Sequence, residues 1–347
     1  MKLLVRATNW IGDAVLSIPA LRAIRGRWPQ AEIALLARPA VAELYRGQGY
    51  ADRLLEFDHV GRHRGTWGRE RLARELRRER FDIALLLQNA FEAAWIAFRA
   101  RIPVRIGYNR DARGFLLTRA VDVPRSGEVP AHEAYYYLEL LRRAGWIERL
   151  PSIENIELHV GPAERERAEG TLRRAGARPG GFRIALAPGA AYGSAKCWPA
   201  QRYAALADRL IAEFDADVIL FGTASDRVTA DTISAAMRRR PVVLVGETSS
   251  GELASLLASS NLFIGNDSGA MHVAAAVGLP VVGVFGPSDP AGTAPVTSRF
   301  TLVRHPVSCS PCFLRHCPVD HRCMTRIEVD AVYAAARPWM ARSAGSV

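Results

Sequence analysis

The sequence predicts an α/β protein with two domains, each a doubly wound parallel sheet covered by helices. Short apolar runs, which are typical of buried strands, alternate with amphipathic stretches of helical period along most of the chain. The alternation begins a second time near residue 183 with another apolar run. The 347 residues, of which 49% are hydrophobic and 23% charged, are enough for two globular domains.

The first half opens with the apolar run KLLVRA (2–7), which predicts a buried strand. A helix is expected over 14–28, where Pro19 either kinks the helix or marks the start of its regular part. The other elements expected in this half are strands over 31–37, 81–88 and 104–108, and helices over 69–80 and 131–145, the last closed by Gly145.

The second half repeats the pattern from RIALAPG (183–189), a strand followed by a glycine turn. Strands bounded by helices of this length indicate parallel sheets with both faces covered. The elements expected here are strands over 216–222, 242–246, 261–266 and 281–286, and helices over 199–214, 225–237, 250–260 and 271–278.

The polar, glycine-rich stretch within 155–180 marks the expected division between the domains. We therefore expect an N-terminal domain over 1–160 and a C-terminal domain over 161–325. A C-terminal helix over 326–347 could pack back on the N-terminal domain.

The charge balance favours an anionic partner. Lys and Arg exceed Asp and Glu by 46 − 35 = 11, and nearly all of the excess is arginine. Such a balance fits a nucleic acid, an acidic membrane surface or an acidic substrate. No apolar run approaches the roughly 20 residues that span a bilayer. The N-terminus has no secretory signal, so cytoplasmic residence is the expectation.

The loop TNWIGD follows the first strand and contains Gly12 and Asp13. Gly12 permits a tight turn or a close backbone approach. Asp13 then begins a helix, where it is either an N-cap or a carboxylate free to act as a general base. The loop is not G-x-G-x-x-G, so a dinucleotide fingerprint is not supported.

The loop APGAAYGSAKCWP (187–199) has the composition of a phosphate-binding loop. Gly189 and Gly193 expose backbone N–H groups, and Ser194 and Lys196 follow just before a helix. A helix N-terminus and a lysine both favour anions, so this loop could hold a diphosphate. It lacks the G-x-x-x-x-G-K-[ST] pattern, and an ordinary flexible connection is the alternative.

Two acids follow later strands. Asp226 comes after a strand that ends in Gly222, and Glu247 lies in VGETSS. A carboxylate in such a place can accept hydrogen bonds from ribose hydroxyls, or it can cap the next helix.

The segment IGNDSGAMH follows the strand over 261–266 and opens a helix. Capping explains either Asp267 or Ser268. It does not explain Asn266, Gly269 and His272 as well. Backbone N–H groups at this helix start would point at an anion, and Gly269 would let the anion approach.

Arginines near two loops could bind carboxylates or phosphates. Within 69–80 many charges pair at i, i+4 spacing and form a solvated helix face. Arg62 and Arg64 precede that helix, and Arg110 and Arg113 lie in GYNRDARGF. Bidentate guanidinium contacts from these four would suit acidic groups.

Four of the five cysteines fall in the segment CSPCFLRHCPVDHRC. Their spacing is C-x2-C-x4-C-x5-C, which does not match the paired C-x2-C pattern of common zinc sites. A structural zinc or iron–sulfur site and a set of reduced cysteines in a compact loop both stay open. The four residues are Cys309, Cys312, Cys317 and Cys323.

Five segments together resemble a known family. NWIGDAVLSIPALRAIR, PGAAYGSAKCWP, FGTASD, GETS and NDSGAMHVAAAVGLPVVGVFGPSDP look, in this order, like the bacterial ADP-heptose:lipopolysaccharide heptosyltransferases, nearest the type II members. The resemblance implies a GT-B fold of two Rossmann-like domains facing a cleft. It also implies an inverting transfer of heptose from ADP-L-glycero-D-manno-heptose to a heptose of the lipopolysaccharide inner core, with no cofactor required for catalysis.

The resemblance assigns roles to the loops. It implies that Asp13 is the catalytic base and that Lys196 meets the charge of the leaving ADP. The residues it implies for the donor are Gly12, Gly189, Ser194, Lys196, Gly222, Asp226, Glu247, Asp267, Ser268, Gly269 and His272. Those expected for the acceptor are Asn9, Arg62, Arg64, Asn89, Arg110 and Arg113.

The implied partners are ADP-heptose and an acidic, lipid-linked Kdo/heptose acceptor. Such an acceptor predicts peripheral contact with the cytoplasmic face of the inner membrane, and we expect a monomer that binds no nucleic acid. The alternatives are a type I heptosyltransferase or another nucleotide-sugar transferase of this fold. From a different class, an arginine-rich nucleic-acid-binding module is the rival, although no stacking platform or recognition motif supports it.

Overall fold

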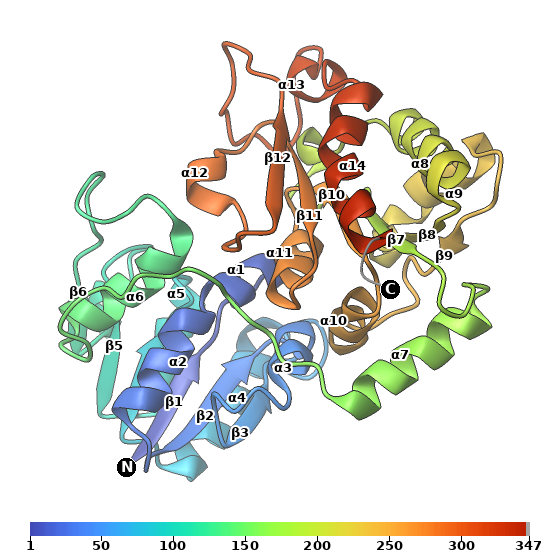
Figure 1. The fold of residues 1–347 in the computed structure, drawn as a ribbon. Coiled ribbons are helices and arrows are strands. Elements are labelled where there is room, and N and C mark those ends of the chain that lie inside the picture. Colours follow the sequence, from blue (N-terminus) through green and yellow to red (C-terminus); the bar gives the residue numbers. More distant parts are fainter. Residues whose placement is uncertain (345–347) are drawn as a thin grey trace. The chain divides into compact units, whose positions relative to one another are not determined.

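The computed structural model describes the backbone of residues 1–344 and the side chains of residues 1–340. The chain divides into two compact units after Ile153. Each unit contains a six-stranded sheet with flanking helices (Figure 1). All strand pairs in both sheets are parallel, which confirms the predicted α/β class.

The first sheet has the strand order β3-β2-β1-β4-β5-β6. Its central strands are buried along nearly their whole length because helices cover both faces. The strands are β1 (Lys2–Arg6), β2 (Glu32–Ala37), β3 (Arg53–Glu56), β4 (Ile83–Leu86), β5 (Val104–Tyr108) and β6 (Arg119–Val121).

The helix expected over 14–28 is two helices in the structure. The break falls at Ser17, so Pro19 lies in the first turn of the second helix, where proline is tolerated. The helices of this unit are α1 (Ile11–Leu16), α2 (Ile18–Arg27), α3 (Pro39–Tyr45), α4 (Gly65–Glu79), α5 (Phe91–Arg99), the short 3-10 turn η1 (Gly114–Leu116) and α6 (Glu133–Arg143).

The second sheet has the order β12-β11-β10-β7-β8-β9. Every residue of β7, β10 and β11 is buried, as expected for the centre of a covered parallel sheet. The strands are β7 (Arg183–Ala187), β8 (Asp217–Leu220), β9 (Val242–Val243), β10 (Leu262–Asn266), β11 (Val281–Phe285) and β12 (Phe300–Arg304).

The helices of the second unit include the one at the end of the chain. They are α7 (Pro162–Arg174), α8 (Ala200–Phe214), α9 (Arg227–Ala236), α10 (Ser250–Ala258), α11 (Gly269–Ala276), α12 (Pro290–Thr293), α13 (Arg322–Thr325) and α14 (Val329–Ala344), with the 3-10 turns η2 (Ser194–Lys196) and η3 (Ala224–Asp226).

The terminal helix α14 packs within the second unit. Val332, Ala336 and Met340 are buried in the same apolar core as residues of α8, β10 and β11. This apolar stripe of α14 is buried on the helix's own unit, where it covers the sheet.

The chain order reverses at the centre of each sheet, between β1 and β4 in the first unit and between β7 and β10 in the second. Ligands of doubly wound folds bind beyond the carboxyl ends of the strands at such a point. Asp13 follows β1 and Asn89 follows β4. In the second unit Lys196 follows β7 and Asp267 follows β10, so both switch points carry residues that the sequence singles out.

Candidate active site

The switch point of the second unit holds a buried ion pair. Lys196 Nζ lies 2.5 Å from Asp267 Oδ2, and the Ser288 hydroxyl donates to the same oxygen at 2.6 Å. Asp267 is 4% exposed. A lysine held against a buried carboxylate has a defined position, and its ammonium has three N–H donors, so it can also meet an anion.

Asn266 fixes the two loops that carry this pair. Its side chain is fully buried at the end of β10. The amide donates to Pro188 O at 2.7 Å, and Oδ1 accepts from the Trp198 backbone N–H at 3.1 Å and the Tyr203 hydroxyl at 3.0 Å. Asn266 therefore joins the loop after β7 to the loop after β10, and its role is structural.

The N-terminus of α11 is open toward this site. Ser268 is the N-cap residue but makes no side-chain capping hydrogen bond. Its Oγ is buried and has no hydrogen-bond partner within the part of the chain that the structure describes. Asp267 does not cap either, because its carboxylate faces Lys196 and Ser288. Capping thus fails to explain these residues, and a buried hydroxyl without a partner fits an absent ligand.

Gly269 and His272 belong to the first turn and middle of α11. Gly269 is its first residue, which leaves the N–H groups of the helix start accessible to an anion. The His272 ring is 4% exposed, on the buried side of the helix. The sequence expectation that both residues contact the donor stays a prediction.

The side chain of Asp226 packs against two glycines of the predicted donor site, Gly189 and Gly222. Its carboxylate accepts from the Thr223 backbone N–H at 2.8 Å and from the Thr223 hydroxyl at 2.9 Å, so it forms a capping box. A Cβ on Gly189 would lie 2.2 Å from Asp226 Oδ1, and a Cβ on Gly222 would lie 3.0 Å from its side chain. Both glycines are needed for space, and Asp226 lies over the loop after β7.

Glu247 and Ser194 lie at the margins of the site. Glu247 is half exposed and pairs with Arg227 at 3.2 Å. Ser194 Oγ and His316 Nδ1 are 2.9 Å apart, which connects the donor loop to the segment that contains the cysteines.

In the first unit, Asp13 lies in the first turn of α1. The N-cap is Trp10, so Asp13 does not occupy the capping position. Burial and then the charge of Asp13 raise the pKa of Glu133 above its usual range, which places the two carboxyl groups near one another. Sequence reasoning missed Glu133, although it begins α6 and could have been considered on that ground. Gly12 lies between Ile11 and Asp13 in the same turn.

Asn9 is held by a buried arginine. Arg6 ends β1 and is 1% exposed, and its Nη2 donates to Asn9 Oδ1 at 2.6 Å. Its Nη1 donates to Ala7 O at 2.6 Å, and the guanidinium lies over the Phe57 ring. Burial lowers the pKa of Arg6 to about 10. The signal for this residue was present in KLLVRA, a charged side chain inside an otherwise apolar run.

Two predicted acceptor residues donate to Tyr136, and a third, Arg113, donates to one of them. Asn89 Nδ2 donates to the Tyr136 hydroxyl at 3.0 Å, and Arg110 Nη1 does so at 3.3 Å. Arg113 donates to Asn89 Oδ1 at 3.0 Å, to Tyr108 O at 3.0 Å and to Gln88 O. Arg113 is fully buried, and burial lowers its pKa to about 10. All three of its nitrogens are used within the protein, so the geometry favours a structural role for Arg113.

Arg62 and Arg64 are exposed before α4. Arg62 hydrogen-bonds to Glu75 through Nη2, while Arg64 is the N-cap residue of α4. Neither shares a hydrogen bond with the group around Tyr136 among the described residues.

The next feature is the set of four clustered cysteines. They are free thiols, with Cys309 and Cys317 exposed and Cys323 buried. Within residues 1–340 no group of three or more His, Cys, Asp and Glu side chains is arranged to hold a metal ion. The predicted zinc or iron–sulfur site therefore has no support. Burial, together with the three nearby cysteines, raises the pKa of the Cys323 thiol, so it favours the neutral form.

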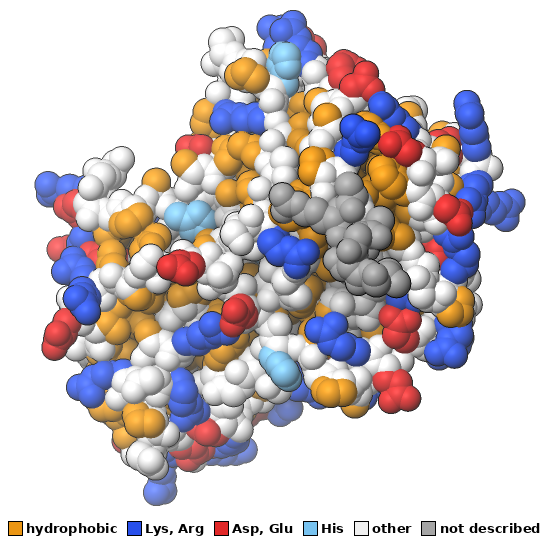
Figure 2. Space-filling view, viewed as in Figure 1, with side chains coloured by type: hydrophobic (Ala, Val, Ile, Leu, Met, Phe, Trp, Pro, Cys, Tyr) orange, Lys and Arg blue, Asp and Glu red, His pale blue; other side chains and the backbone are white. Residues whose placement is uncertain are grey.

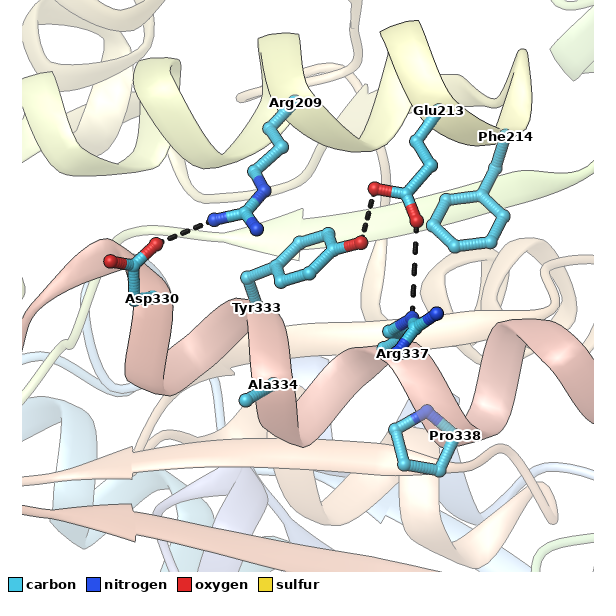
Figure 3. A pocket seen from close by; sticks show the side chains of 8 residues that line it. All are labelled: Arg209, Glu213, Phe214, Asp330, Tyr333, Ala334, Arg337 and Pro338. Carbon is cyan, nitrogen blue, oxygen red and sulfur yellow. Dashed lines mark hydrogen bonds and ion pairs between the residues drawn. The ribbon is translucent and has the colours of Figure 1, made fainter.

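A groove on the second unit lies between α8 and α14 (Figure 3). Its charges are paired: Arg209 contacts Asp330 at 2.5 Å, and Glu213 accepts from the Tyr333 hydroxyl. These contacts join the two helices and leave little to recognise a ligand. We assign them to packing.

The basic side chains are widely spread. In the view of Figure 2, Lys and Arg side chains are dispersed with Asp and Glu among them. Many arginines are used in ion pairs, such as Arg53 with Glu79 at 2.7 Å. No helix of the described residues is both long enough and apolar enough to cross a membrane.

Comparison with known proteins adds sequence evidence. A family model described as Glycosyltransferase family 9 (heptosyltransferase) matches residues 69–322. The chain is 33% identical over 315 residues to lipopolysaccharide heptosyltransferase 2 of Salmonella typhimurium, and 32% identical over 317 residues to that of Escherichia coli K12. Each match covers 88% of both chains.

Solved structures share the fold. The E. coli ADP-heptose lps heptosyltransferase II is 28% identical, with a TM-score of 0.82 over 99% of this chain and 100% of that one. A family 9 glycosyltransferase from Veillonella parvula gives a TM-score of 0.84 at 23% identity, over 98% and 97% of the two chains. At this identity, the similarity to the Veillonella parvula protein supports the shared fold and no shared function.

Proposed function

Since the chain belongs to glycosyltransferase family 9, the heptosyltransferases, we propose that it moves heptose from ADP-L-glycero-D-manno-heptose to a heptose of the lipopolysaccharide inner core. The chain is thus a glycosyltransferase of the GT-B class, and the donor, the acceptor and the residue roles are the proposal. The relatives named above are type 2 heptosyltransferases, which favours the second heptose transfer over the first.

The observation that carries the proposal is the arrangement around Lys196. Lys196 and the start of α11 lie at the switch point of one sheet, and the Ser268 hydroxyl beside them is buried without a partner. A diphosphate needs a cation, backbone N–H groups and a hydroxyl donor. The second unit provides all three in one place, so we assign the ADP moiety to it.

The reaction requires one displacement. In the proposal, Asp13 takes the proton of an acceptor hydroxyl while that oxygen forms a bond to the anomeric carbon of heptose. The bond from this carbon to the diphosphate oxygen breaks, its electron pair leaves with ADP, and the configuration inverts. Lys196 and the N-terminus of α11 meet the charge that develops on the leaving diphosphate. The chain's own residues accept the proton and meet the charge that develops in this step, so the proposal calls on no cofactor.

The remaining roles divide between the units. Asp226 and Glu247 are proposed to accept hydrogen bonds from ribose hydroxyls. Arg62, Arg64 and Arg110, with exposed guanidinium groups, are proposed to bind the acidic groups of the acceptor. Asn9, Asn89 and Arg113 are the other residues proposed for the acceptor site. Their side chains form hydrogen bonds within the first unit, so we propose that they shape the acceptor loops.

A lipid-linked acceptor brings the enzyme to a membrane surface. We propose that the protein makes peripheral contact with the cytoplasmic face of the inner membrane, and the net charge of +11 supports this contact. We also propose that it acts as a monomer.

The test is release of ADP from ADP-heptose in the presence of a heptose–Kdo–lipid A acceptor. Wild type should release ADP only when the acceptor is present, and Asp13→Ala should lower the rate about 100-fold or more, the scale of a lost general base. Asp122→Ala, which removes an exposed carboxylate of the same unit, is the matched control and should retain the rate.

Three outcomes separate the parts of the proposal. Acceptor-dependent release that survives Asp13→Ala would remove Asp13 as the base and leave the transferase assignment in place. Release with another sugar nucleotide in preference to ADP-heptose would change the donor. No release with any heptose donor or acceptor would overturn the heptosyl transfer itself.

A further inference from the structure

The segment over 305–323, which contains the four clustered cysteines, lies against the donor loop over 190–196. The two are separated by more than a hundred residues in the chain, yet three side-chain contacts join them. The Tyr192 hydroxyl donates to Phe313 O at 2.8 Å. Ser194 Oγ lies 2.9 Å from His316 Nδ1, and His321 Nε2 lies 2.7 Å from Ala195 O. We call the segment over 305–323 the brace.

Ala195 has both of its backbone polar groups bonded to the brace. Its N–H donates to Arg315 O at 3.0 Å, and its carbonyl accepts from His321. A carbonyl oxygen can only accept, so Nε2 of His321 carries the proton in this contact. Ala195 immediately precedes Lys196, whose ammonium contacts Asp267. The brace therefore fixes the main chain from which the lysine side chain extends.

The fit between the two segments leaves no space at Gly193. A Cβ there would lie 2.2 Å from Arg315 O, a backbone atom that a side-chain rotation cannot move away. Tyr192 also lies between two cations: Lys196 Nζ is 5.2 Å from the centre of its ring and the Arg315 guanidinium 5.1 Å. Such contacts between a cation and a ring face are attractive.

The other side of the brace is bonded to the loop after β11. The Ser310 hydroxyl donates to Gly286 O at 2.6 Å. The backbone N–H groups of Cys312 and Phe313 both donate to Pro287 O, at 3.0 and 2.8 Å. The next residue, Ser288, donates to the Asp267 carboxylate. The brace thus joins the two loops whose side chains contact Asp267, one through Lys196 and one through Ser288.

We propose that the brace is a positioning device for the donor site, and that His321 is its main positioning residue because it bonds to Ala195, next to Lys196. The inference rests on the proposed function for the meaning of that site. His321 touches neither donor nor acceptor in this account and acts by holding η2 in place. The loop that holds a diphosphate is rich in glycine and small residues, so without such an anchor its ordering would have to occur on binding.

Hydrogen–deuterium exchange tests the brace without reference to any substrate. The peptide that covers residues 188–198 should exchange at least several-fold faster in His321→Ala than in wild type, because a local anchor is lost. His321→Gln keeps an N–H donor at a similar distance from the backbone and should restore most of the protection. His305→Ala is the matched control, because among the described residues this histidine of the brace has no hydrogen bond to the donor loop. Unchanged exchange in His321→Ala would overturn the inference.

Kinetics with ADP-heptose then tests what the brace does. His321→Ala should raise the KM for the donor and the Kd for ADP about 10-fold, the scale of one hydrogen bond plus the ordering it provides. It should leave the KM for the acceptor unchanged, and His321→Gln should recover most of the loss. Equal defects in the Ala and Gln variants, with an equal fall in Tm, would show a role in stability alone and contradict positioning.

Gly193→Ala provides an independent variant, since its added methyl group would push the donor loop away from Arg315. It should show the same faster exchange and the same rise in the KM for the donor. Exchange could be faster in both variants while the wild-type protein neither binds ADP nor releases it from ADP-heptose. That result would uphold the brace and refute the proposed function. Unchanged exchange in both variants, together with turnover of ADP-heptose by wild type, would refute the brace and uphold the proposed function.

Discussion

The two units have the same strand order, yet the polar residues at their switch points do different work. Numbered within its own unit, each sheet runs 3-2-1-4-5-6. In the first unit the residues beyond the central strands include two buried guanidinium groups, Arg6 and Arg113, that donate to backbone carbonyls and asparagine side chains. In the second unit the corresponding place holds the pair of Lys196 with Asp267 and a buried hydroxyl, Ser268, that lacks a partner.

This difference supports the proposal that the second unit binds a small anionic ligand. The two buried arginines of the first unit donate within the protein through five of their six nitrogens, with Arg6 Nε left unpartnered among the described residues, so they mainly shape loops and leave recognition to exposed groups. The second unit keeps donors available beside a helix N-terminus, as a diphosphate requires. Shared topology therefore sets where a ligand can bind, and the loop residues determine which chemistry each unit performs.

The largest effect is expected at Lys196. The chain has 46 lysines and arginines, of which only Lys2 and Lys196 are lysines, so the composition favours arginine wherever a cation suffices. Lys196→Ala should lower kcat/KM for the donor by about 100-fold or more, because it removes a charge that meets the leaving diphosphate. Lys196→Arg should also lose at least about 10-fold, since the wider guanidinium does not fit against the buried Asp267 carboxylate as a compact ammonium does. ADP release assays measure both.

Lys2→Ala is the matched control for this prediction. Lys2 lies in the first unit and pairs with Glu32 and Glu79 at 3.4 Å. Its loss should leave turnover unchanged, because exposed ion pairs of this kind contribute little. Full activity in Lys196→Arg would show that only the charge matters, and would weaken the argument from the choice of lysine.

The next prediction concerns Arg113, which the sequence places in the acceptor site and the structure buries. Arg113→Ala would leave Tyr108 O, Gln88 O and Asn89 Oδ1 without their donor. The free energy of unfolding of the first unit should fall by about 3 kcal/mol, and its Tm by roughly 10 °C. Differential scanning calorimetry measures this change. Binding of ADP, which we assign to the second unit, should be unaffected.

Arg110→Ala is the comparison for Arg113. Arg110 is exposed, and its contacts are to Tyr136 at 3.3 Å and Asp111 at 3.6 Å. It should leave the Tm within a few degrees and raise the KM for the acceptor. If Arg113→Ala instead kept its Tm and raised only the KM for the acceptor, Arg113 would be a binding residue as the sequence suggested.

The sequence allowed prediction of the central strands and of the loops that follow them, for a physical reason. Fully buried strands such as β10 and β11 are continuous apolar runs, and the turn after each one contains glycine and short polar side chains. The strands β3, β6 and β12 were not predicted. They lie at the edges of the sheets and are partly exposed, so they carry no continuous apolar signal.

Side-chain partners were harder to predict than loop positions. The sequence placed Lys196 and Asp267 in one donor site, and the structure shows them in contact at 2.5 Å. It could not show that Arg113 is buried, because an arginine in a polar loop has the same appearance whether it faces solvent or backbone carbonyls. Nor could it find the contact between His321 and Ala195, which depends on two loops being brought together by tertiary structure.

The smallest effect is expected at Glu133, the carboxyl group beside Asp13. Burial and the charge of Asp13 raise the pKa of Glu133, so Glu133 takes up its proton at a higher pH than an exposed glutamate would. Asp13 has this effect only while it is ionised, so Glu133 is already neutral when Asp13 takes up its proton. Glu133→Gln preserves this neutral form, so the acidic limb of the pH–rate profile should stay within about 0.5 pH unit of the wild-type position.

The measurement is kcat for ADP release between pH 5 and pH 8 in wild type and in Glu133→Gln. Glu128→Gln is the control, because the pKa of this exposed glutamate is lowered by the Arg125 backbone N–H and by Arg143, away from Asp13. Its profile should overlay that of wild type. A fall in kcat of about 100-fold or more across this pH range in Glu133→Gln would mean that Glu133 itself, and not Asp13, accepts the proton in the first unit. The base would then be a different carboxylate of the first unit, and the proposed donor site in the second unit would be unaffected.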